Sequence, residues 1–171
     1  TYSLLVGYFN RNQKQTLDIP IGSNNRIEPG GPDRGQPTHF LTRRQWGVFT
    51  ITVPADFGNK KLIWTLVAHN KTTEIPMGLD PLWKVSPLKD MAQGNTPPVL
   101  RFDPDGSAQQ GPPREISLSL DATVSEPITL STWASDDGLV DAYRRGRDDP
   151  RVSLMWSKFR GPGDIVFSET N

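Results

Sequence analysis

The chain has 171 residues, and its nineteen basic and nineteen acidic side chains give a formal net charge of zero at pH 7. No bulk charge of one sign is available to attract nucleic acid or an anionic membrane, so the composition supports neither as a partner. The absence of cysteine excludes disulfides and thiolate chemistry. Sixteen prolines and fifteen glycines disfavour long helices, and we expect an all-β chain of short strands.

The first segment, residues 1–88, predicts a β-sandwich module. Its strand-like runs are 2–9, 17–21, 47–53, 61–68 and 72–77. We expect the run 2–9 to be buried on both faces. Because about seven turn-prone residues separate the runs 47–53 and 61–68, they are predicted to form an antiparallel pair. Turn formers fill residues 22–37, which are predicted to be a long polar loop.

A proline-rich linker is predicted over residues 89–98, and a second module over residues 99–171. Just before the linker, Leu82, Trp83 and Val85 are expected to pack partly. In the second module apolar and polar residues alternate over 116–120, 128–132 and 152–156, and a further strand is predicted over 165–167. The alternation is typical of strands with one buried face.

The second segment contains NTPPV at 95–99, WASDDG at 133–138 and VSLMWSKFRGPG at 152–163. Over about 70 residues it resembles the PKD-type or cadherin-like immunoglobulin domains of secreted bacterial proteins, and the wider arrangement is similar to an uncharacterised family of environmental bacteria. The resemblance implies an immunoglobulin-like sandwich with Trp156 in the core. It also implies an extracytoplasmic location (periplasm, cell surface or secreted) and no catalytic residues.

The chain departs from that pattern because family members continue after the GPG turn with two more strands. The second module is therefore predicted to be incomplete. Three explanations are open: the protein is longer than this chain, a neighbouring subunit lends strands, or the first segment pairs across into one composite fold. The chain begins with Thr1, and no apolar stretch reaches the ~18 residues that span a bilayer, which favours a mature or partial chain whose export signal has been removed.

Acidic turns are the candidate metal ligands. Asp103, Asp105, Asp136 and Asp137 lie in turns between predicted strands, and calcium prefers such carboxylate oxygens. The alternative is that aspartate is chosen there because it bonds its own backbone in turns. We predict no other cofactor.

A basic loop is one candidate partner-binding surface. It contains Tyr143, Arg144, Arg145, Arg147 and Arg151. These residues suit an acidic partner or a phosphate. Because aspartates lie among them, local pairing on a solvated loop is the competing interpretation.

Aromatic residues are the other candidate surface. Of five tryptophans, Trp64 and Trp156 are in phase with apolar neighbours and are predicted to be core. Trp46 and Trp83 lie at a strand start and near the linker, so they are the candidates for stacking on a sugar or a partner. His39 and His69 have no acid at ligand spacing and are interpreted as ordinary residues.

The sequence therefore predicts a non-catalytic extracytoplasmic structural protein that acts as a subunit of a larger assembly. Such an assembly would be a fibre, a surface layer or a membrane-bound complex, and the partners would be protein subunits of the same or a different kind. The alternative is a carbohydrate-binding or adhesion module, stabilised by calcium. A third hypothesis makes the chain an appendage of a larger enzyme.

Overall fold

The structure is a computed structural model that describes residues 1–84, 96–113, 116–138 and 152–168. The described chain is nearly all β, with several small antiparallel sheets and a short 3-10 helix η1 (Pro81–Trp83), which confirms the predicted all-β class. It divides into two compact units. The first unit comprises Thr1–Lys84 and Trp156–Asn171, and the second comprises Val85–Met155.

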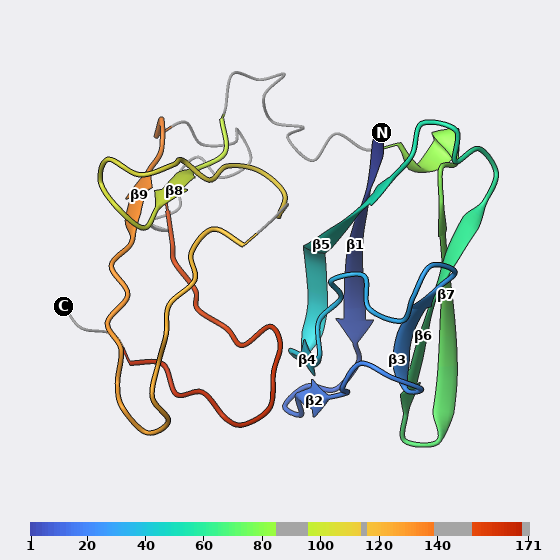
Figure 1. Cartoon of the computed structure of the whole chain (residues 1–171), viewed down its shortest axis with the longest axis horizontal. Helices are drawn as coiled ribbons and strands as arrows, with labels where there is room; N and C mark the ends of the chain where they lie inside the picture. Colours follow the sequence, from blue (N-terminus) through green and yellow to red (C-terminus); the bar gives the residue numbers. More distant parts are fainter. Residues whose placement is uncertain (85–95, 114–115, 139–151, 169–171) are drawn as a thin grey trace. The chain divides into compact units, whose positions relative to one another are not determined.

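Two main sheets build the first unit (Figure 1). Strands β1 (Tyr2–Asn10) and β5 (Arg43–Val53) form an antiparallel two-stranded sheet. Strands β3 (Asn25–Glu28), β6 (Lys61–Ala68) and β7 (Lys71–Gly78) form a three-stranded sheet in the order β3-β6-β7. A smaller pair joins β2 (Leu17–Asp18) to β4 (His39–Phe40).

The predicted pairing of 47–53 with 61–68 is wrong, because β5 and β6 belong to different sheets. Both runs carry an apolar face, and the chain crosses between the sheets so that these faces meet across the core. Phe49 of β5 contacts Trp64 of β6 edge to face, with ring centroids 5.2 Å apart. β5 pairs instead with β1, and β6 pairs with β3 on one side and with β7 on the other.

The core of the first unit is centred on Trp64, which is fully buried. Its ring also stacks against Phe40, with centroids 6.1 Å apart, as the sequence predicted for a core tryptophan. Its Nε1 donates a 2.9 Å hydrogen bond to Oδ1 of Asn25. The amide of Asn25 in turn donates to the carbonyl oxygens of Ile19 and Pro37, so one buried asparagine links β3, β6 and two loops.

Two local predictions in this unit are wrong. The run 2–9 is buried on one face only, since Leu4 and Val6 are core residues whereas Ser3 and Phe9 on the other face are exposed. The predicted loop 22–37 contains β3, because Ile27 packs into the core and its segment pairs with β6. The first of these segments is covered on one face only, and the second forms a strand because Ile27 enters the core.

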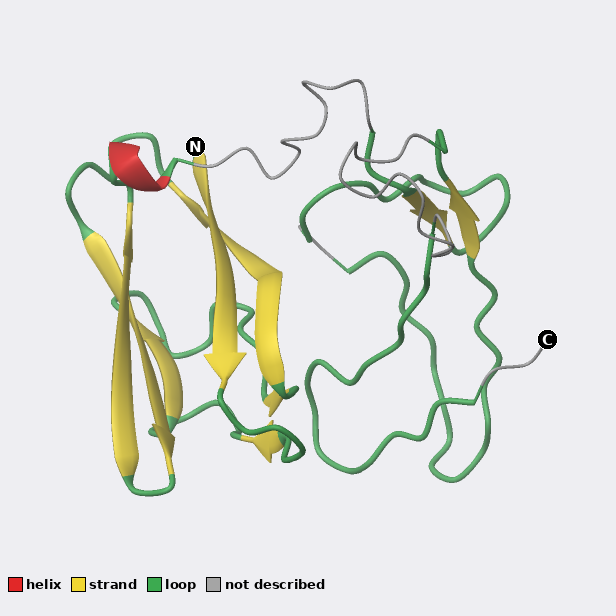
Figure 2. Cartoon of the chain, turned by 180° about the vertical axis from the view of Figure 1, so that it is seen from behind, coloured by secondary structure: helices red, strands yellow, loops and turns green. Residues whose placement is uncertain are grey.

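The second unit holds one short strand pair, β8 (Val99–Arg101) with β9 (Trp133–Ser135). Figure 2 shows the rest of its described chain as loop. The strands predicted over 116–120, 128–132 and 152–156 are not part of any ladder in the described residues, and neither is the run 165–167 of the first unit. Alternation makes a segment suitable for a sheet, but a ladder also needs a neighbouring strand.

The segment after residue 155 groups with the first unit. Backbone N–H groups of Thr38 and His39 both donate to the carbonyl oxygen of Phe159, at 3.1 and 3.2 Å. These contacts join the end of the described chain to the first unit, and the three explanations for the incomplete second module stay open. The module boundaries 1–88, 89–98 and 99–171, and the immunoglobulin-like sandwich, stay predictions, and most of the linker lies outside the described residues.

Candidate functional site

Both tryptophans singled out from the sequence are open to solvent. Trp46 lies in β5 with 81% of its surface exposed, and Trp83 lies in η1 with 78% exposed. The two lie in different elements, and no described contact joins them. Contrary to the predicted partial packing before the linker, Leu82 is also exposed. Trp156, expected in the core, is 42% exposed.

The β1–β5 sheet has a bulge at Trp46. The register passes from Val6 opposite Phe49 to Tyr8 opposite Gln45, so Gly7 alone faces the longer stretch that contains Trp46 and Gly47. A Cβ on Gly7 would lie 2.4 Å from the carbonyl oxygen of Gln45, which leaves room only for glycine. Gly47 has a φ of +55°, a left-handed conformation that glycine adopts without steric cost. Bulges of this kind redirect a side chain out of the regular pleat.

Next to the bulge, Arg44 lies over two aromatic rings. Its guanidinium carbon is 4.8 Å from the centroid of Phe9 and 5.0 Å from that of Trp46. Phe9 and Arg44 are direct partners across the β1–β5 ladder, which fixes their spacing. We call Phe9, Arg44 and Trp46 the arginine–aromatic cluster. Sequence reasoning missed Phe9 and Arg44, although a glycine inside each strand-like run was a signal of a bulge.

We call residues 156–168, which follow the second unit, the docked segment. Polar side chains of this segment bond to residues of β2 and of the chain between β3 and β4. Nζ of Lys158 donates to Oδ1 of Asp18 at 3.0 Å, and Nδ1 of His39 lies 3.0 Å from the same oxygen. Hydrogen bonds from His39 and Lys158 hold the pKa of the Asp18 carboxyl below its ordinary value. Arg160 pairs with Asp33 at 2.7 Å, and the amide of Gly35, followed by Arg160, lowers the pKa of Asp33.

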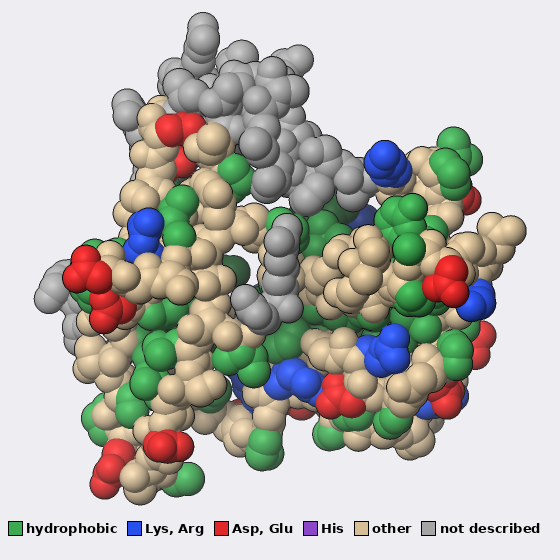
Figure 3. Space-filling model, turned by 45° about the horizontal axis from the view of Figure 1, so that its top comes forward, with side chains coloured by type: hydrophobic (Ala, Val, Ile, Leu, Met, Phe, Trp, Pro, Cys, Tyr) green, Lys and Arg blue, Asp and Glu red, His purple; other side chains and the backbone are tan. Residues whose placement is uncertain are grey.

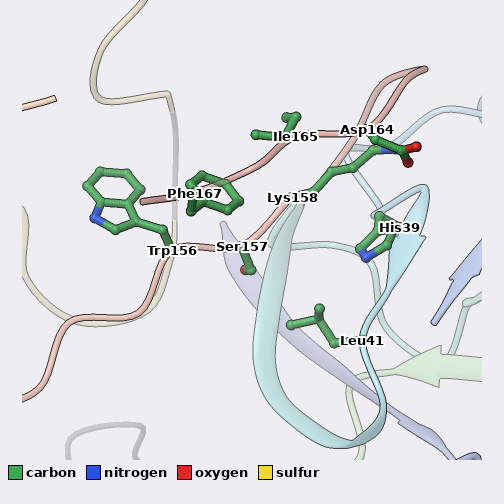
Figure 4. Close-up of a pocket in the computed structure, with 8 residues that line it drawn as sticks. All are labelled: His39, Leu41, Trp156, Ser157, Lys158, Asp164, Ile165 and Phe167. Atoms are coloured by element: carbon green, nitrogen blue, oxygen red, sulfur yellow. The ribbon is translucent and has the colours of Figure 1, made fainter. Parts of the chain in front are cut away.

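A pocket of about 220 Å³ lies where this segment meets β4 (Figure 4). It is lined by His39, Leu41, Trp156, Ser157, Lys158, Asp164, Ile165 and Phe167. In Figure 4 Trp156 and Phe167 line one end, and His39, Lys158 and Asp164 line the other. Among the described residues no hydrogen bond joins His39 to Ser157, so the pocket lacks the nucleophile–base contact that covalent catalysis uses.

The aspartates proposed as calcium ligands are bonded to nearby chain. Asp103 Oδ1 accepts from the amide of Asp105, and Asp136 Oδ2 accepts from that of Gly138. Asp137 Oδ2 accepts from the amide and the hydroxyl of Thr96. In the described residues no group of three or more His, Cys, Asp or Glu is placed to hold a metal ion. The contacts of Asp103 and Asp136 are those of the turn interpretation, whereas Asp137 bonds a residue far along the chain. Calcium binding stays a prediction.

The basic loop with Tyr143, Arg144, Arg145, Arg147 and Arg151 lies outside the described residues. Its role as a partner surface stays a prediction.

Large apolar side chains of the second unit are exposed rather than packed. In Figure 3 hydrophobic side chains reach the surface in many places on the face that is drawn. The exposed side chains of this unit include Ile116, Leu118, Leu120, Val124, Ile128, Leu130, Leu154 and Met155. The hydroxyl oxygen of Thr132 is buried in this unit without a hydrogen-bond partner. This one unsatisfied hydroxyl and the exposed apolar residues together mark a unit that is not closed by its own described residues.

Comparison with protein-family models, with curated proteins and with solved structures found no match to this chain. No helix in the described ranges is both long and apolar enough to cross a membrane. The resemblance to PKD-type domains and the extracytoplasmic location therefore stay predictions.

Proposed function

We propose that this chain is a non-catalytic interaction subunit, working outside the cytoplasm, whose second unit is covered by another polypeptide in an assembly. The observation that carries the proposal is the exposure of alternating apolar residues in the second unit. Ile116 is 82% exposed and Val124 is 91% exposed, and Leu118 and Leu120 follow Ile116 at a spacing of two. Apolar surface that is contiguous and exposed is typical of protein-binding regions.

The backbone of the same region favours a polypeptide as the partner. Within the described ranges no backbone hydrogen bond joins residues 116–122 to another segment, and a polypeptide partner would supply such bonds. An added strand satisfies backbone N–H and C=O groups in series, and a second layer supplied by the same partner would cover the alternating apolar face. A small ligand satisfies only one or two of them.

The magnitudes are sufficient for a stable complex. Full burial of a leucine or isoleucine side chain contributes about 1.5–3 kcal/mol. Association costs roughly 4–15 kcal/mol in lost translational and rotational freedom, and more for ordering the interface. Burying most of the exposed side chains of the second unit offsets that cost, whereas burying one or two does not.

Sedimentation velocity over a wide concentration range, with native mass spectrometry of the protein purified from its source, tests the proposal. We expect self-association or a bound protein subunit, and we expect Ile116→Ser with Val124→Ser to weaken it. The matched control is Val166→Ser, because Val166 of the first unit is 92% exposed and lies outside the proposed surface. A monomer without partner in both measurements contradicts the proposal, as does equal weakening by the control.

A further inference from the structure

The three side chains of the arginine–aromatic cluster contact one another in the absence of a ligand. Arg44 lies over both rings, and the ladder pairing of Phe9 with Arg44 sets the spacing of their backbones. Trp46 is nevertheless 81% exposed. A large aromatic ring that is both exposed and oriented gains affinity for a ligand, because little side-chain freedom is lost on binding.

The bulge lies in the backbone beneath the cluster. Gly7 and Gly47 are both required by the bulge, the first by close approach of Gln45 and the second by its positive φ. Phe49, Ile51 and Val53 of β5 are buried, so the two-residue alternation of the strand already turns Trp46 to the outer face. The bulge adds a local change of twist at this point of the ladder.

The surroundings of the cluster are positively charged, although the whole chain has zero net charge. Residues 1–17 and 38–55 contain no aspartate or glutamate, whereas Arg11, Lys14, Arg43 and Arg44 lie within them. Arg43 pairs with Asn10 in the ladder, one position from Arg44. Within the described ranges none of these cations forms an ion pair. The field at the cluster therefore attracts an anion.

An aromatic face next to an unpaired guanidinium suits a ligand that has an apolar face and a carboxylate. The C–H face of a sugar ring packs on an indole, and a carboxylate accepts charge-assisted hydrogen bonds from arginine. A neutral sugar would leave the cations unused. A single-stranded nucleic acid needs several open rings for successive bases, whereas of the two rings in the cluster Trp46 is 81% exposed and Phe9 only 49%. We propose that the arginine–aromatic cluster is a binding site for acidic saccharides of the uronate type.

Affinity gel electrophoresis and calorimetry with polygalacturonate test this site. We expect the intact chain to bind, and we expect Trp46→Ala and Arg44→Lys each to weaken binding by about tenfold or more. Arg44→Lys keeps the charge but loses the planar stacking group, so it keeps the test valid even where Trp46→Ala unfolds the chain. Trp83→Ala is the matched control, because Trp83 is 78% exposed and has no described arginine over its ring; we expect no change.

Three further polymers separate the alternatives. Polyglutamate has the carboxylates without a sugar ring, dextran has the ring without charge, and an oligothymidylate has phosphates and bases. We expect all three to bind at least about tenfold more weakly than polygalacturonate, because each lacks one of the paired features. Equal binding of polyglutamate, stronger binding of the oligothymidylate, or no binding of polygalacturonate overturns the proposal. Equal loss in Trp46→Ala and Trp83→Ala also overturns it.

Discussion

The two units share an alternation of apolar and polar residues but differ in what their apolar side chains contact. In the first unit Phe49 and Ile51 of β5 meet Trp64 and Leu62 of β6 in one core. In the second unit Ile116 has the same two-residue spacing to its neighbours but is exposed. The difference teaches that alternation specifies which face of a segment is apolar. Whether that face becomes a core depends on a second layer.

The largest expected difference in stability between the two units comes from removing the centre of the core of the first unit. Trp64→Ala deletes a fully buried ring that contacts Phe40 and Phe49, and we expect a loss of about 3–5 kcal/mol in the free energy of unfolding. Val124→Ala in the second unit removes an exposed side chain, and we expect a change within about 0.5 kcal/mol. Urea unfolding followed by circular dichroism measures both. Similar losses in the two variants would show that the units do not differ as described.

A buried polar group gives the next largest effect. Asn25→Ala removes the partner of Trp64 Nε1 and of two carbonyl oxygens, so we expect a loss of at least about 1–3 kcal/mol from groups left buried and unsatisfied. Asn24 is the matched control because it precedes Asn25 and its side chain is exposed. The midpoint of urea unfolding should fall for Asn25→Ala and stay unchanged for Asn24→Ala.

A methyl group added at Gly7 tests how closely β1 and β5 of the first unit approach each other at the bulge. Gly7→Ala places a Cβ within 2.4 Å of the Gln45 carbonyl oxygen, and we expect a loss of about 1–3 kcal/mol as the bulge shifts. Ser3→Ala on the same strand is the control, since Ser3 is exposed. Differential scanning calorimetry of the three proteins checks the order. A Gly7→Ala variant as stable as the control would contradict the tight approach.

Acid should loosen the docked segment, which is the smallest expected effect. The pKa values of Asp18 and Asp33 lie below the ordinary 3.8, so their contribution is present above about pH 4 and is lost as the pH falls through the lowered values. The Gly161 amide donates to Thr38 Oγ1 and its NMR signal should report the change. Asp18→Asn with Asp33→Asn should remove the dependence between pH 4 and pH 2; an unchanged profile would contradict it.

Part of the fold could be predicted from particular residues. The run 61–68 has a clear two-residue period around Trp64, and β6 spans those residues. The pairing of β5 with β1 could not be predicted, because it depends on which apolar faces close over one another rather than on the intervening turn. The short β3 was missed because turn formers surround Ile27. Its ladder partner β6 lies far along the chain.

The candidate site was predicted in the same partial way. Trp46 was singled out because it opens a strand-like run, and it is exposed beside Arg44. Phe9 comes from a segment more than thirty positions earlier, so no local pattern joins it to Trp46. Trp83 had an equal claim from the sequence, and only the structure distinguishes the two by the cation over the ring. The register of β1 against β5, which brings Phe9 opposite Arg44, could not be inferred from local sequence patterns.

The return of the segment after residue 155 to the first unit changes how the covalent chain connects the two units. The polypeptide leaves the first unit after Lys84 and rejoins it at Trp156, so the second unit is an insertion held at both ends. A single protease cut within the second unit would leave the C-terminal fragment attached through Phe159 and Lys158. Pulling on the second unit would likewise divide the force between two connections. The docked segment therefore works as a second tether, which a chain with its units in simple series would lack.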